Sequence, residues 1–147
     1  MEEWIELEKK RYLTAYDMGS ISLNFSFLSR YLSSYGIPVP NIEEVEVSPY
    51  VLPYGLQETF NAVEKNIQTF EKIFNERLNV KNKYFKKYTW GKQLFNVKKE
   101  IYRWFDWLNE VGKYRISYQN LVDINGEQIT DINGNPLQVL KISKEEL

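Results

Sequence analysis

Apolar residues recur at steps of three and four in three stretches of this 147-residue chain, and that spacing constrains the fold more than any other feature. Such steps place side chains on one stripe of an α-helix. The three sets are Met18, Ile21, Phe25, Leu28, Leu32 and Tyr35; Leu56, Phe60, Val63, Ile67, Phe70, Phe74 and Leu78; and Leu94, Val97, Ile101, Trp104, Phe105, Leu108 and Val111. The pattern predicts three amphipathic helices that share one core, with buried side chains at Ile67, Phe70, Ile101, Trp104 and Leu108.

Residues typical of helix ends flank these stretches. Thr14 and Asp17 resemble a capping box before the first helix, and Gly36 should end it. Thr89 is the expected N-cap of the third helix, and Gly112 lies where that helix should stop. The proline-containing stretch 37–53 predicts an extended crossover between the first two helices.

After Gly112 the periodicity changes from helical to alternating. Residues 115–122 and 137–142 are predicted strands, with a short extended stretch at 128–130 between two Asn-Gly turns, at 125–126 and 133–134. We therefore predict a mainly α fold with a C-terminal antiparallel β-hairpin. The chain is expected to be a single domain, 1–147, with a helical part at 1–115 and a hairpin at 116–143.

Composition narrows the chemistry. The chain has neither Cys nor His, which excludes disulfides and thiolate nucleophiles and removes the commonest general base and metal ligand. Its net charge of −1 gives no global attraction to nucleic acid or to an anionic membrane. We accordingly expect no enzymatic activity, no catalytic, cofactor-binding or metal-binding residues, and no cofactor.

Two acidic stretches superficially resemble calcium loops, at 123–127 and 131–135. A calcium loop needs a glycine at its sixth position and a late bidentate glutamate. In both stretches the glycine comes fourth, so we interpret them as hairpin turns. The pair Asp106 and Glu110 lies one turn apart on the predicted polar face of the third helix, which indicates a solvated pair rather than a catalytic one.

A basic and aromatic stretch between the second and third helices is the best candidate for nucleic-acid contact. Lysine side chains neutralise phosphates, and aromatic rings stack on unpaired bases. The lysines are Lys81, Lys83, Lys86 and Lys87. The competing interpretation, which the near-neutral chain favours, is a solvated linker.

Four large apolar residues lie off the helical stripes and are the predicted protein interface: Leu23, Phe27, Tyr102 and Trp107. A helix that is apolar all round must be buried all round, and exposed aromatic patches mark interfaces. One alternative is that the N-terminal segment or the hairpin covers them. We predict that at least two, Phe27 and Trp107 first, are exposed in the isolated chain and contact other subunits, in a hetero- or homo-oligomeric assembly.

The chain begins without the basic and apolar regions of a signal peptide, and it lacks an apolar run of the roughly 18 residues that span a bilayer. We therefore expect a cytoplasmic protein without a membrane partner.

Three segments, at 13–18, 59–67 and 103–109, resemble small structural proteins of tailed bacteriophages that infect low-GC Gram-positive hosts. In that group, an extended aromatic segment precedes an Asn-rich amphipathic helix, and the proteins build tail or baseplate parts. The resemblance covers about the first 115 residues and implies a non-enzymatic structural or adaptor subunit of a virion tail, baseplate or connector, assembled in the host cytoplasm. The alternatives are a small phage- or mobile-element-encoded nucleic-acid-associated protein and an inhibitor of a host protein.

Overall fold

The computed structural model describes residues 4–9, 15–45, 53–80 and 97–144. The chain divides into two compact units, Met1–Gly112 and Lys113–Leu147, each of which is considered by itself. The division falls after residue 112 instead of after the expected 115. The single-domain organisation stays a prediction.

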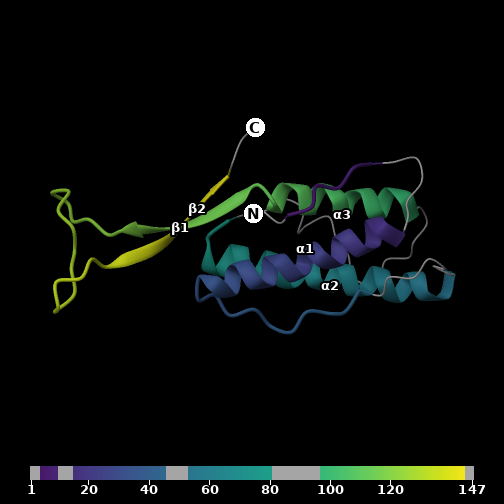
Figure 1. The fold of residues 1–147 in the computed structure, drawn as a ribbon, viewed down its shortest axis with the longest axis horizontal. Helices are drawn as coiled ribbons and strands as arrows, with labels where there is room; N and C mark the ends of the chain where they lie inside the picture. The colour runs from purple at the N-terminus through teal and green to yellow at the C-terminus, as the bar shows by residue number, and fades with distance from the viewer. Residues whose placement is uncertain (1–3, 10–14, 46–52, 81–96, 145–147) are drawn as a thin grey trace. The chain divides into compact units, whose positions relative to one another are not determined.

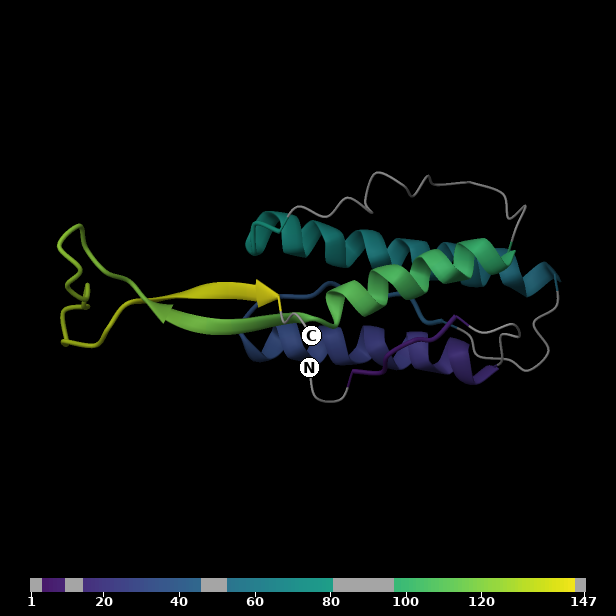
Figure 2. The same cartoon turned by 90° about the horizontal axis from the view of Figure 1, so that it is seen from above.

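The first unit contains α1 (Ala15–Ser34), α2 (Pro53–Arg77) and α3 (Val97–Val111), as Figure 1 shows. The views in Figures 1 and 2 agree that the three helices lie side by side and run in the same direction. Parallel neighbours need long connections, and residues 37–45 run back along α1 and α2 in an extended conformation. The described part of the predicted crossover is therefore extended, as expected from its prolines.

The predicted core is confirmed. The side chains of Ile67, Phe70, Trp104 and Leu108 are fully buried, and Ile101 is 5% exposed. Aromatic rings join the helices: Phe25 of α1 stacks on Phe70 of α2 with 5.9 Å between ring centroids, and Phe60 of α2 meets Trp104 of α3 at 5.6 Å. Ring pairs at these separations contribute about 0.5–1.5 kcal/mol beyond the burial of their area.

Gly36 ends α1 as predicted, through a Schellman motif. Its φ is +76°, its N–H donates to the Ser33 carbonyl at 3.0 Å, and the Ile37 N–H donates to the Leu32 carbonyl at 3.1 Å. Ile37 and Leu32 are both buried, which supplies the apolar contact of this motif. The third helix ends at Val111, before Gly112, as expected. The predicted caps at Thr14 and Thr89 lie outside the described residues.

Three asparagines hold the extended segments against the helices through the same pair of hydrogen bonds, which we call an asparagine clamp. Each side-chain amide accepts a hydrogen bond from the N–H of one backbone residue and donates one to the carbonyl of that residue. Asn24 of α1 binds Ile5 in this way, at 2.9 and 2.8 Å. Asn109 of α3 binds Leu7, at 2.8 Å for both bonds.

The third clamp lies on α2, where Asn66 binds Glu43 of the crossover at 2.7 and 2.9 Å. Lys65 adds an ion pair to the Glu43 carboxylate, with 2.6 Å between Nζ and Oε1. These amides satisfy part-buried peptide groups of Ile5, Leu7 and Glu43, and a buried peptide group needs such a partner.

The second unit is an antiparallel ribbon of β1 (Tyr114–Asn120) and β2 (Gln138–Lys144). Its register pairs Tyr114 with Lys144 and Asn120 with Gln138. The predicted hairpin is thus confirmed, although each strand differs slightly from its expected bounds. The short stretch expected at 128–130 forms two isolated bridges, Val122 with Gln128 and Thr130 with Pro136.

Beyond the ribbon, three backbone residues close a ring of hydrogen bonds. Leu121 donates to the Leu137 carbonyl at 2.8 Å, Leu137 to Ile129 at 2.8 Å, and Ile129 to Leu121 at 2.9 Å. The ring joins the ribbon to two small loops, which we name lobe 1 (residues 123–127) and lobe 2 (residues 131–135). Figure 1 shows the two lobes at the far end of the ribbon.

Candidate protein interface

Two of the four predicted interface residues lie on the outward side of α1. Leu23 is 50% exposed, and Phe27 is half-buried with the Arg30 guanidinium 4.8 Å from its ring centroid. Tyr16, seven residues before Leu23, is 69% exposed. Because steps of seven and four return to the same side of a helix, these three residues form one surface, the outer α1 stripe (Tyr16, Leu23 and Phe27).

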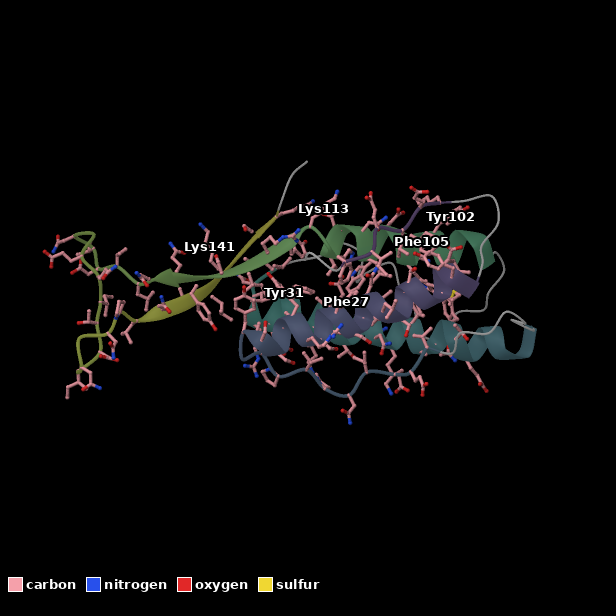
Figure 3. All side chains as sticks on the ribbon, viewed as in Figure 1. Phe27, Tyr31, Tyr102, Phe105, Lys113 and Lys141 are labelled. Atoms are coloured by element: carbon pink, nitrogen blue, oxygen red, sulfur yellow. The ribbon has the colours of Figure 1, made fainter. Side chains whose placement is uncertain are left out.

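Tyr102 of α3 is half-buried, and its contacts come from its own chain. Its ring lies 5.9 Å from that of Phe105, and the Lys9 ammonium lies 5.9 Å from its centroid. Lys9 also forms an ion pair of 2.8 Å with Asp106. Figure 3 labels Tyr102 and Phe105 on α3 and Phe27 on α1. The N-terminal segment thus covers part of Tyr102, as the alternative interpretation proposed for such residues.

The expectation that Trp107 is exposed is wrong. Its side chain is fully buried, its indole N–H donates to the Glu71 carboxylate of α2, and its ring meets Phe25 of α1 at 6.5 Å. The stripe of α3 is wider than its spacing indicated, because α3 packs against two helices at once. Trp107 belongs to the core and not to the interface.

The core contains a polar element that the sequence analysis did not single out. Glu64 and Glu71 of α2 are 3% and 2% exposed, and they accept the indole N–H groups of Trp104 (3.3 Å) and Trp107 respectively. Burial raises the pKa of the Glu71 carboxyl, and the hydrogen bond from Trp107 opposes this in part. The spacing of the sequence could have indicated this burial, because positions 64 and 71 continue the α2 stripe at helical steps from Phe60 and Ile67.

The turn interpretation of the two acidic stretches is confirmed. In lobe 1, the Asp123 carboxylate accepts the N–H groups of Asn125 and Glu127, at 2.8 and 3.0 Å. In lobe 2, Asp131 accepts those of Asn133 and Asn135, both at 2.9 Å. These carboxylates therefore shape the loops.

The lobes also expose apolar side chains that sequence reasoning did not include in the interface. Ile124 of lobe 1 is 100% exposed, and Ile132 of lobe 2 is 99% exposed. Along the ribbon and the ring, Tyr118, Val122 and Val139 are also exposed. The repeated sequence Asp-Ile-Asn-Gly could have indicated the exposed isoleucines, because it places an apolar residue inside each turn.

The predicted nucleic-acid residues Lys81, Lys83, Lys86 and Lys87 lie outside the described residues. Within the part of the chain that is described, no group of three acidic side chains is placed to hold a metal ion. No helix among the same residues is long and apolar enough to cross a membrane.

The comparisons with known proteins found no family model, no curated protein and no solved structure that matches this chain.

Proposed function

We propose that this chain is a non-enzymatic structural or adaptor subunit that acts through protein–protein contacts. The observation that carries the proposal is the outer α1 stripe, where Tyr16 and Leu23 are exposed and Phe27 is half-buried on a helix whose other side is packed into the core. Fully burying such a side chain is worth about 1.5–3 kcal/mol, and the isolated chain forgoes about half of this at Leu23, which is 50% exposed.

The ionisable groups of the core support the same proposal. Glu64 and Glu71 are held by indole N–H groups in a tightly packed interior, where they organise helix contacts. Acid–base catalysis needs a titratable group in reach of a substrate. Both glutamates are buried, at 3% and 2% exposure, so neither side chain is presented to solvent where a substrate would meet it.

The resemblance to phage tail and baseplate proteins supplies the setting of the proposal, a virion tail, baseplate or connector. It is tested by mass spectrometry of particles purified from cells that carry the gene. We expect the chain in the particles at a fixed ratio to the other structural proteins. Its absence from particles and from every other large assembly in those cells would refute the proposal.

A variant test addresses the surface itself. Leu23→Glu with Phe27→Glu should leave the helical unit folded and prevent incorporation into the assembly. The matched control is Ser26→Glu with Ser33→Glu, which adds the same charge at two exposed polar positions of α1. Normal assembly of the first double variant would show that the outer α1 stripe is not the contact.

A further inference from the structure

The tip of the second unit is built from an eight-residue repeat. Leu121, Ile129 and Leu137 are spaced by eight, and Asp-Ile-Asn-Gly follows the first two at the same offset. The repeat has a structural counterpart, because these three residues close the hydrogen-bonded ring and the two lobes have matching bonds. The lobes are therefore two copies of one local structure on one base.

Turn formation explains the aspartate and the glycine of the repeated Asp-Ile-Asn-Gly, but it does not explain the isoleucine. The aspartate accepts two backbone N–H groups, and each glycine has a φ of +83°, which favours glycine strongly. The N–H of Gly126 donates to the Asp123 carbonyl at 3.0 Å, and Gly134 to Asp131 at 3.1 Å, which closes both turns. The position after the aspartate accepts most residue types, so the turn does not require an apolar one.

Isoleucine at that position contributes no packing within the chain, since both side chains are essentially fully exposed. Single exposed apolar residues are common on protein surfaces. The two isoleucines lie at equivalent positions of two matching loops whose backbones are held by hydrogen bonds, and a backbone that is ordered before binding lowers the entropic cost of binding.

The charge around the tip identifies the kind of surface that it fits. Between residues 116 and 140 the sequence has three acidic residues, Asp123, Glu127 and Asp131, and no Lys or Arg. An anionic membrane would repel this end of the ribbon, whereas a protein pocket edged by basic side chains would attract it.

We propose that lobes 1 and 2 insert Ile124 and Ile132 together into two apolar pockets edged by Lys or Arg on one protein partner. This inference rests on the proposed role in protein–protein contacts and adds a second contact to the outer α1 stripe. Two equivalent anchors on one base bind with an effective concentration that one anchor lacks.

The test places a photo-crosslinking amino acid at position 124 or 132 of the full-length chain, in cells that carry the gene. We expect both positions to crosslink to the same protein, at peptides that contain apolar residues next to Lys or Arg. Gln119, exposed on β1, is the matched control position and should give little of this product. Crosslinks to lipid, to a second copy of this chain, or to unrelated proteins at the two positions would overturn the proposal, as would the absence of a crosslink.

Binding to the crosslinked partner is then measured with Ile124→Ser and Ile132→Ser. Each change should weaken binding about 10-fold or more, and the double change about 100-fold or more, as expected for two buried apolar anchors. Because both side chains are exposed, the thermal melt should not change. Unaltered affinity of the double variant would overturn the inference. If the outer α1 stripe variants still block assembly, the proposed function survives that result.

Discussion

The asparagine clamps on the N-terminal segment give the most searching test of the helical unit. Asn109→Ala removes two hydrogen bonds to Leu7, and Asn24→Ala removes two to Ile5. A hydrogen bond contributes about 0.5–1.5 kcal/mol net, so each variant should lose about 1–3 kcal/mol of unfolding free energy.

The double variant should lose less than the sum of the single ones. Ile5 and Leu7 are two residues apart in one extended segment, so that breaking one clamp weakens the docking on which the other depends. Once the segment has left the helices, removing the second asparagine costs little further unfolding free energy.

Two measurements check this reasoning: urea unfolding for the free energies, and amide hydrogen exchange at Ile5 and Leu7 for the local effect. Both amides should exchange faster in each variant, while the amides of α2 keep their protection. Asn75→Ala, at an exposed position of α2, is the control for the loss of an asparagine from a helix. Unchanged exchange at Leu7 in Asn109→Ala, or full additivity in the double variant, would refute the clamp.

Three further predictions address the core and the basic stretch. Ile101→Ala should cost about 2–5 kcal/mol in a denaturant melt, because it leaves a cavity in the shared core, and an unaltered melt would contradict the packing. Burial raises the pKa of Glu71 above 4.5, so the stability that Glu71 contributes is greatest at low pH and is lost as pH rises through its folded-state pKa. Across that rise, the unfolding free energy of Glu71→Gln should increase relative to that of the wild type. A difference between the two proteins that does not change with pH would contradict the raised pKa. If the basic stretch is only a linker, the chain should bind single-stranded DNA weakly with little salt dependence; a steep salt dependence, abolished by changing Lys83, Lys86 and Lys87 to Ala, would favour the nucleic-acid alternative.

The sequence by itself determined the features that depend on neighbours a few residues away. The helical stripes follow from the period of 3.6, and the stop at Gly36 follows from bonds that span three and five residues. The lobes follow from Asp123 and Asp131, whose carboxylates bind backbone groups two and four residues on. Such interactions join residues that are close in sequence, so the sequence pattern predicts them.

Only the tertiary structure decided which polar and off-stripe residues are internal. Trp107 is buried between α1 and α2, where Glu71, 36 residues away, accepts its N–H, and Asn109 binds Leu7 across 102 residues. A local sequence pattern does not specify which residue will bind a side chain from 36 or 102 positions away. Such residues meet only when the helices pack and the intervening chain closes into a loop. Because its partners are distant in sequence, the helical spacing alone predicted Trp107 to lie at an interface. The packing of α3 against both neighbouring helices places it in the core instead.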